Sequence, residues 1–199
     1  MNARRRREET ALERRRLIVD VAMQCFAENG FHRTSLRDLA RRAGISLGNV
    51  YNHFESKNDL IREIADLEAE ELRALQIELD RIANPQKALD QFIQHYVRYC
   101  AEPENAGLAA EILSEGLRNP EIRSGFRRNR AALADALADL VARLWERAGK
   151  SPDLRAIDGA QAVLDLVEGY ALRAAFEDRS PSRRDLATLK AGAHRLLGL

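Results

Sequence analysis

One short stretch of the chain carries side chains that could read a DNA double helix. Between residues 46 and 53, hydroxyl, amide, phenol and imidazole groups follow one another at helical spacing. Amide side chains can hydrogen-bond adenine edges in the major groove, and apolar groups can contact thymine methyls. The candidates for base contacts are Ser46, Leu47, Asn49 and Asn52. An ordinary corner between two helices gives the same pattern, so the residue types alone leave both interpretations open.

A second group of residues could bind the DNA backbone. Its members carry hydroxyl, phenol, imidazole or ammonium groups: Thr34, Ser35, Tyr51, His53 and Lys57. Lys57 falls in the first turn of an expected helix, where a positive charge opposes the helix dipole. A phosphate bound beside the exposed amides of that turn would explain the lysine. We therefore interpret Lys57 as a phosphate contact.

Two short helices around a glycine turn must position these side chains. Ser35 and Asp38 have the spacing of a capping box, so a helix is expected to begin near Leu36. Gly44 follows its last apolar residue and suits a left-handed helix end. Ser46 can cap the next helix, whose core face carries Val50 and Phe54. The pattern predicts a helix-turn-helix.

This stretch resembles the DNA-binding domain of the TetR family of bacterial transcriptional regulators. The family motif has an alanine-glycine turn, a following serine and Tyr-x-x-Phe-x-x-Lys, with three further matches upstream. The matching residues are Ala43, Gly44, Ser46, Tyr51, Phe54 and Lys57, with Phe26, Gly30 and Thr34 before them. The resemblance implies that Tyr51 and Lys57 contact the DNA backbone. Leu47 stands where many relatives have a polar residue, which leaves thymine contact and simple packing both open.

The composition indicates an all-α protein. Helix-forming residues dominate the 199 positions, and no run alternates in the way of a strand. Asn-Pro and Ser-Pro pairs begin the later helices. We expect about nine helices: four up to about Ala83, then roughly 85–101, 105–117, 120–148, 153–178 and 182–198. The expected domains are a helix-turn-helix domain over 1–65 and an effector-binding and dimerisation domain over 66–199.

Positive charge gathers in the amino-terminal part. Residues 1–56 contain 11 Lys and Arg against 7 Asp and Glu, a net charge of +4, whereas the remainder has 21 against 24, a net charge of −3. This difference fits phosphate contact by the first part. Arg4 to Arg7 lie before the first helix, which is expected to begin at about Thr10. Residues 1–9 are thus expected to be a flexible basic arm that either follows phosphates or is simply solvated.

Several residues of the carboxy-terminal region could line a pocket for a small molecule. They are aromatic, acidic or imidazole side chains: Phe92, His95, Tyr96, Tyr99, Glu111, Glu115, Trp145 and Tyr170. Simple packing of the aromatic residues, and a solvated face for the two glutamates, are the alternatives. The family resemblance implies an effector cavity in this region and specifies no ligand.

The last two helices carry more apolar surface than one packing face requires. The residues that we expect at a subunit interface are Val163, Val167, Tyr170, Ala174, Leu189 and Leu196. In the TetR family, the last two helices of each subunit pair into a four-helix bundle, which implies a homodimer. Burial of both faces within one subunit is the alternative.

Motifs for catalysis or metal binding are missing from the sequence. It contains no H-E-x-x-H, no Cys-x-x-Cys, no glycine-rich phosphate loop and no G-x-S-x-G. We therefore expect neither an enzyme nor a metal or other cofactor. The distant cysteines, Cys25 and Cys100, suggest reduced thiols, and no stretch is apolar enough to cross a membrane, so we expect a cytoplasmic protein.

The combined hypothesis is a homodimeric transcriptional repressor. It would bind a pseudo-palindromic operator in double-stranded DNA and be released by a small-molecule effector. Two other classes stay open: a helical enzyme, and a helical adaptor that uses the same corner to bind a protein.

Overall fold

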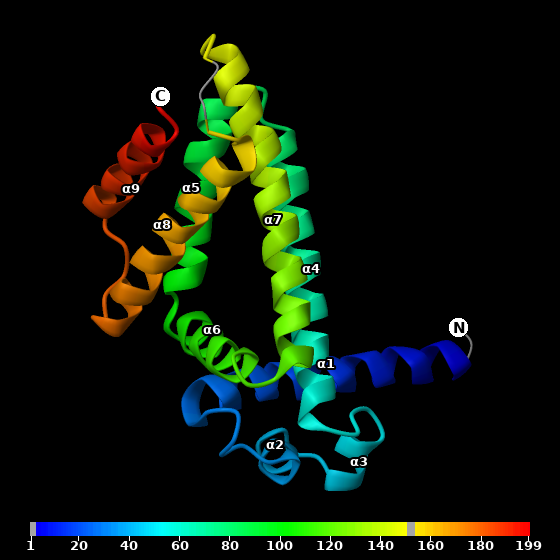
Figure 1. Cartoon of the computed structure of the whole chain (residues 1–199). Helices are drawn as coiled ribbons and strands as arrows, with labels where there is room; N and C mark the ends of the chain where they lie inside the picture. The colour runs from blue at the N-terminus through cyan, green and yellow to red at the C-terminus, as the bar shows by residue number, and fades with distance from the viewer. Residues whose placement is uncertain (1–2, 151–153) are drawn as a thin grey trace. The chain divides into compact units, whose positions relative to one another are not determined.

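The computed structural model describes the backbone of residues 3–150 and 154–199, and the side chains from residue 9 onward outside the same gap. Over these residues the chain forms nine α-helices and no strand (Figure 1), which confirms the all-α prediction. The helices are α1 (Ala3–Asn29), α2 (Leu36–Arg42), α3 (Leu47–Tyr51), α4 (Lys57–Asp80), α5 (Pro85–Ala101), α6 (Pro103–Gly116), α7 (Pro120–Arg147), α8 (Ala156–Phe176) and α9 (Arg183–Leu196).

The helices form two compact units. The amino-terminal unit comprises residues 1–67 and 107–126, and the carboxy-terminal unit comprises 68–106 and 127–199. The first segment ends close to the expected boundary at residue 65, but residues 107–126 group with the amino-terminal helices. Their apolar side chains explain this grouping, because Ile122 is buried in the amino-terminal core and Leu108 and Phe126 pack against it.

The core of the amino-terminal unit fixes the helix-turn-helix. Phe26 of α1, Leu39 of α2, Val50 of α3 and Leu60 of α4 are almost completely buried together with Phe54. Each of the four helices therefore contributes to one hydrophobic cluster. Truncating a buried apolar side chain lowers the free energy of unfolding by roughly 2–5 kcal/mol. This shared core therefore fixes the positions of α2 and α3 against α1 and α4.

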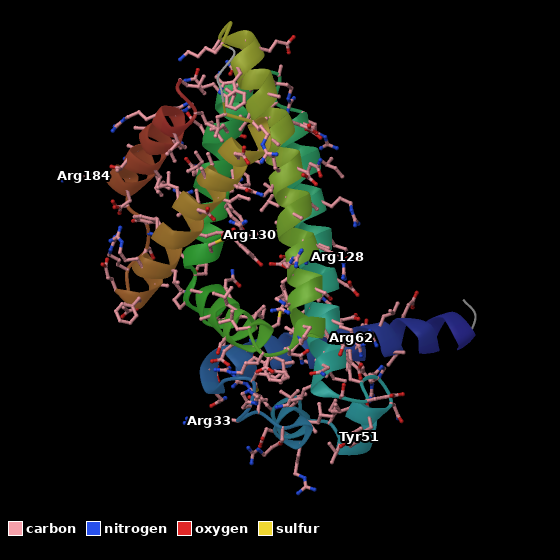
Figure 2. The ribbon with its side chains drawn as sticks, viewed as in Figure 1. Arg33, Tyr51, Arg62, Arg128, Arg130 and Arg184 are labelled. Atoms are coloured by element: carbon pink, nitrogen blue, oxygen red, sulfur yellow. The ribbon has the colours of Figure 1, made fainter. Side chains whose placement is uncertain are left out.

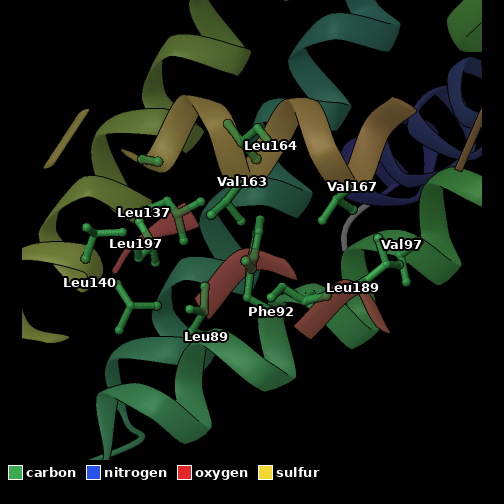
Figure 3. Packing of buried hydrophobic residues seen from close by; sticks show 14 of the residues in the cluster. Leu89, Phe92, Val97, Leu137, Leu140, Val163, Leu164, Val167, Leu189 and Leu197 are labelled. Carbon is green, nitrogen blue, oxygen red and sulfur yellow. The ribbon is translucent and has the colours of Figure 1, made fainter. Parts of the chain in front are cut away.

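Three helices form the centre of the carboxy-terminal unit. Helix α8 packs against both α5 and α9, and Figure 3 shows Val163 and Val167 in this core with Phe92 and Leu189. Helix α8 comes especially close to the residues after α9, since a methyl group on Gly159 would lie 2.8 Å from Leu197 Cδ2. Apolar residues on two faces of α8 thus serve packing within the chain.

The first helix begins earlier than expected. Helix α1 starts at Ala3 rather than near Thr10, so the backbone of residues 3–9 is helical and is not an arm without regular structure. Its residues are alanine, arginine and glutamate, which are strong helix formers, and no glycine or proline interrupts them. The expected start of a helix at Ser151-Pro152 lies outside the described residues.

Truncation of a buried side chain in the carboxy-terminal unit should cost more stability than truncation of an exposed one. Phe92 is fully buried, whereas Ile77 of α4 is 51% exposed. We expect Phe92→Ala to lower the free energy of unfolding by about 3–5 kcal/mol, because it leaves a cavity. Ile77→Ala should cost about 0.5 kcal/mol. Urea titrations followed by circular dichroism measure both, and equal losses for the two variants would contradict this packing.

Candidate nucleic-acid interface and effector site

Local hydrogen bonds form the helix-turn-helix as the sequence predicts. The amide of Asp38 donates to the Ser35 hydroxyl (3.2 Å), and the amide of Ser35 donates to the Asp38 carboxylate (3.1 Å), which completes the capping box. Gly44 has φ +67°, the left-handed conformation expected at the turn. The Asn49 amide then donates to the Ser46 hydroxyl (3.1 Å), so Ser46 caps α3. These caps set where each helix begins and ends.

Helix α3 turns one face to the core and another to solvent. Val50 and Phe54 are buried in the amino-terminal core, whereas Tyr51 is 52% exposed and Asn52 is also exposed. Leu47 is half-buried and packs against the same core, which favours the packing role that the sequence left open. The outward face has the polar and aromatic groups that base and phosphate contacts require.

Asn49 has an unusual environment for a candidate reading residue. Its side-chain oxygen is buried and has no hydrogen-bond partner among the described residues. A buried acceptor without a partner costs roughly 1–3 kcal/mol. Rotation of this amide toward a base would remove that cost, so the side chain has a physical reason to leave its position when DNA is present.

A cleft of about 700 Å³ lies beside α3. It is lined by hydroxyl, aromatic and basic residues of α2, α3, the start of α4 and the loops between them: Phe31, His32, Thr34, Ser35, Leu36, Arg37, Leu47, Tyr51, Ser56, Lys57 and Asn58. Four predicted backbone contacts, Thr34, Ser35, Tyr51 and Lys57, are therefore brought together. The fifth, His53, is half-buried and does not line this cleft.

Besides Ser35 in the capping box, two of the predicted backbone contacts already have partners within the unit. The Thr34 hydroxyl is buried and donates to the carbonyls of Gly30 (2.9 Å) and Cys25 (3.2 Å), so it holds the end of α1. The Lys57 ammonium donates to the Phe31 carbonyl (2.5 Å) and lies 4.3 Å from the centre of the Phe31 ring. Burial lowers the pKa of Lys57. The lysine thus has an internal reason for its place, and phosphate contact by Lys57 remains a prediction.

Two exposed arginines near α2 were not among the contacts predicted from the sequence. Arg33 in the loop before α2 and Arg37 on α2 are exposed, and among the described residues neither forms an ion pair. Figure 2 shows Arg33 extending away from the ribbon. By contrast, Arg41 pairs with Asp38 (2.9 Å). The local excess of basic residues was the available signal for Arg33 and Arg37.

Arg15 of α1 was also missed, although it supports the end of α3. Its guanidinium donates two hydrogen bonds to Glu63 (2.9 and 2.6 Å) and one to the His53 carbonyl (3.1 Å). It also lies 4.4 Å from the centre of the Phe54 ring. The hydrogen bond to Glu63 raises the pKa of Arg15. Its place three residues before Ile18, on the apolar face of α1, was the signal.

Two family models match the chain. Residues 18–64 match the model for bacterial regulatory proteins of the tetR family. Residues 85–198, more than half of the chain, match the model for the carboxy-terminal part of BetI-type transcriptional repressors. The chain belongs to the TetR family. The prediction of a DNA-binding transcriptional regulator is confirmed by this membership.

Relatives of this TetR-family protein match along most of its length. The HTH-type transcriptional regulator UidR of Escherichia coli (strain K12) is 29% identical over 170 residues, which are 81% of each chain. The solved structure of Salmonella enterica GusR has a TM-score of 0.78 and 25% identity, and covers 94% of this chain and 97% of that one. The fold is also that of the transcriptional regulator FadR from Bacillus subtilis in complex with stearoyl-CoA (TM-score 0.75, 18% identity, covering 91% and 96%).

The predicted effector residues of the TetR-family chain are divided between the two units. Phe92 and Trp145 are buried in the carboxy-terminal core, and His95 is exposed. Glu111 and Glu115 belong to the amino-terminal unit, where they contact the loop after α1. A cavity of about 20 Å³ between α4, α5 and α7 has only Phe92 from the predicted set in its lining, and it has room for about one water molecule.

Three of the predicted effector residues take part in polar contacts of the carboxy-terminal unit. Tyr96 stacks on Phe92 at 5.1 Å and donates to Glu168 (3.0 Å), which also accepts from Arg130 (3.1 Å). Tyr99 donates to Glu71 (3.3 Å). The third, Tyr170, accepts from Arg179 near the end of α8 (2.9 Å).

Two partly buried groups of the same unit, Glu68 and Cys100, have raised pKa values. Asn129 donates to the Glu68 carboxylate (2.8 Å), and burial raises the pKa of that carboxyl. Burial also raises the pKa of the Cys100 thiol to about 12.

Most of the predicted interface residues of α8 and α9 are buried within the chain. Val163, Val167, Ala174 and Leu189 are at most 4% exposed, so they are not available to a second copy. Tyr170 is half-buried, and Leu196 is 49% exposed. Other apolar residues of α8 are exposed instead: Leu172 (52%) and Phe176 (91%). The periodicity identified two apolar faces of α8 and could not show that residues of both faces pack within the chain.

Within residues 3–150 and 154–199, no three His, Cys, Asp or Glu side chains gather as a group that could hold a metal ion. None of the helices in these two ranges has the length and apolar character that a membrane span requires.

Substitution of Arg15 should weaken DNA binding because it loosens the end of α3. Arg15→Ala should lower the free energy of unfolding by about 1–2 kcal/mol, since it removes hydrogen bonds to a carboxylate and to a backbone carbonyl. DNA affinity should fall with it. The matched control is Arg16→Ala, which removes the same charge from the exposed neighbour. Thermal unfolding and DNA titration measure both effects; identical behaviour of the two variants would show that Arg15 contributes charge alone.

Proposed function

We propose that the protein is a homodimeric repressor that binds a pseudo-palindromic operator and is released by a small molecule. The observation that carries this proposal is α3, which is anchored by Val50 and Phe54 and presents Tyr51 and Asn52 beside the cleft. Two copies of α3 on one side of a dimer would enter successive major grooves. The functional division that we propose is a DNA-binding domain over 1–65 and an effector-binding and dimerisation domain over 66–199.

Specific roles at the DNA interface follow from exposure and donor chemistry. We assign base contacts to Ser46, Leu47, Asn49 and Asn52, which lie on α3 and at its two ends; Leu47 would use the part of its side chain that does not pack against the core. Backbone contacts are assigned to Thr34, Ser35, Tyr51, His53 and Lys57. Since the Thr34 hydroxyl is engaged inside the unit, its contact would use the main chain. Arg33 and Arg37 add cations beside the cleft that can neutralise phosphates.

The dimer interface that we propose lies on the exposed apolar residues of α8 and α9. Phe176 and Leu172 on α8, with Leu196 on α9, leave large apolar side chains in solvent. Gly169 is exposed and has no heavy atom within 4 Å of a would-be methyl group, so a second helix could approach its backbone. Apolar groups that stay exposed in a single chain are a common mark of an interface.

The effector is expected to be an organic molecule bound in the carboxy-terminal unit; FadR, which shares the fold, was solved in complex with stearoyl-CoA. The cavity there holds about one water molecule, so a ligand would have to open the helices around Phe92. A ligand that changes DNA affinity must bind the DNA-free and DNA-bound forms with different strength. The aromatic residues Phe92, Tyr96, Tyr99 and Trp145, with His95 and Tyr170, remain the proposed lining. We place the protein in the cytoplasm, where operators and metabolites meet.

Selection of duplex DNA by the purified protein tests the assignment of base contacts. Asn49→Ala should change the base preference at one position of each half-site, because an amide that pairs with a base edge contributes about 1–3 kcal/mol of discrimination. Tyr51→Ala should weaken binding to all sequences alike. If the selected sequence were the same for Asn49→Ala and the wild type, Asn49 would not be a reading residue. Failure of the wild type to retain any duplex at low salt would favour the adaptor or enzyme class.

A charge on the exposed end of α8 should separate the subunits. Phe176→Asp would bury a carboxylate at the proposed interface, which is strongly unfavourable without a partner. We expect a dimer for the wild type and a monomer for Phe176→Asp in sedimentation velocity at micromolar concentration. Leu113→Asp changes a similarly exposed apolar residue on α6 and should remain dimeric. A monomeric wild type would exclude the homodimer.

A further inference from the structure

Two glutamates of α6 bind consecutive residues of the loop after α1. The Phe31 amide donates to Glu111 (3.0 Å), and the His32 imidazole lies 2.8 Å from the Glu115 carboxylate. Glu111 and Glu115 are four residues apart, so they stand one above the other on the same face of α6. All of these residues belong to the amino-terminal unit, whose compact core also includes the start of α7.

The loop is shaped to receive the Glu111 carboxylate. Gly30 has φ +83°, and a methyl group at this position would lie 3.3 Å from a Glu111 oxygen. A second glycine, Gly107, brings α6 close to α1, since a methyl group there would lie 3.3 Å from the Ala27 carbonyl. Both glycines thus allow a close approach, and the carboxylate reaches the main chain at the point where α1 ends.

Phe31 connects this contact to the cleft beside α3. Its amide is held by Glu111, its carbonyl accepts from Lys57, and its ring covers the Lys57 ammonium at 4.3 Å. The negative charge of the nearly buried Glu115 also acts on Lys57, against the effect of burial on the lysine's pKa. The position of the ammonium therefore depends on where α6 holds Phe31.

We propose that Glu111 is a positioning residue for DNA binding, which acts through Phe31 to hold the Lys57 ammonium at the cleft. This inference rests on the proposed function, because it requires that the cleft receives a DNA phosphate. Glu111 does not touch DNA in this account. Its contribution is to keep the acceptor of Lys57 ordered before DNA arrives, so that less conformational freedom is lost on binding.

Whether replacement of Glu111 weakens or strengthens DNA binding distinguishes a positioning role from simple electrostatics. A carboxylate near a DNA interface repels phosphates, so removal of its charge alone should strengthen binding. Loss of an ordering contact should weaken binding instead. Glu111→Ala removes both the charge and the acceptor, whereas Glu111→Gln removes the charge and keeps an acceptor oxygen for the Phe31 amide. Glu104→Ala removes the same charge from an exposed position on the same helix.

The experiment measures the affinity of these variants for the duplex that the wild type selects in vitro, over a range of salt concentrations. We expect Glu111→Ala to bind about fivefold to tenfold more weakly, the size of one hydrogen bond, and Glu111→Gln and Glu104→Ala to bind at least as well as the wild type. Unchanged or tighter binding by Glu111→Ala would overturn the proposal. A wild type that binds no duplex would instead contradict the proposed function.

Combination with Lys57→Ala tests whether Glu111 acts through the lysine. In the Lys57→Ala background, the effect of Glu111→Ala should shrink to less than about twofold, because coupled residues are not additive. An effect of full size in that background would overturn the proposed route. If Glu111→Ala does not fold, Glu111→Asp decides, since it keeps the charge and shortens the reach to the Phe31 amide. Weaker binding by Glu111→Asp would support the proposal, and wild-type binding would overturn it.

Discussion

The shortness of α3 is the constraint on which the rest of the amino-terminal unit depends. The helix spans only Leu47–Tyr51, whereas isolated helices shorter than about 12–15 residues are marginal in water. Its shape and direction must therefore come from its neighbours. Ser46 caps its first turn, Val50 and Phe54 anchor it in the core, and Arg15 binds the carbonyl of His53 just after its end. Val50, Phe54 and Arg15 hold α3 from its inner side, and Tyr51 and Asn52 stay exposed on the other side.

Three carboxylates of the amino-terminal unit accept hydrogen bonds from donors of the same unit. Glu63 accepts both hydrogen bonds of the Arg15 fork, Glu28 pairs with Arg42, and Glu111 holds the Phe31 amide. Each of these acids is bound to a donor of the unit itself and so presents less free charge to a phosphate. Arg33 and Arg37 keep exposed cations near the cleft. Arg33 and Arg37 therefore mark the side of the unit that we expect DNA to approach.

The local features of the helix-turn-helix could be predicted because their signals lie within a few residues. The capping box of Ser35 and Asp38, the left-handed Gly44, and the core positions Val50 and Phe54 all follow from spacing, and the structure confirms them. The contact between Glu111 and Phe31 could not be predicted in this way, since 80 residues separate the two.

Two other interpretations lacked information that only the fold supplies. Helix periodicity showed that α8 is apolar on more than one face, but only the packing shows that both faces, with Val163 and Val167, are covered within the chain while Phe176 near the helix end stays exposed. The dipole argument for Lys57 was sound for an isolated helix and lacked the Phe31 carbonyl, which becomes a neighbour only in the folded unit. Sequence patterns identify which residues need a partner, and the fold supplies the partner.

The most direct test of this account is a structure of the protein bound to the duplex that it selects. The account predicts that α3 lies in the major groove, that Asn49 or Asn52 reaches a base edge, and that a phosphate lies within hydrogen-bond distance of Tyr51 or Lys57. DNA bound against another surface, or α3 outside the groove, would contradict it.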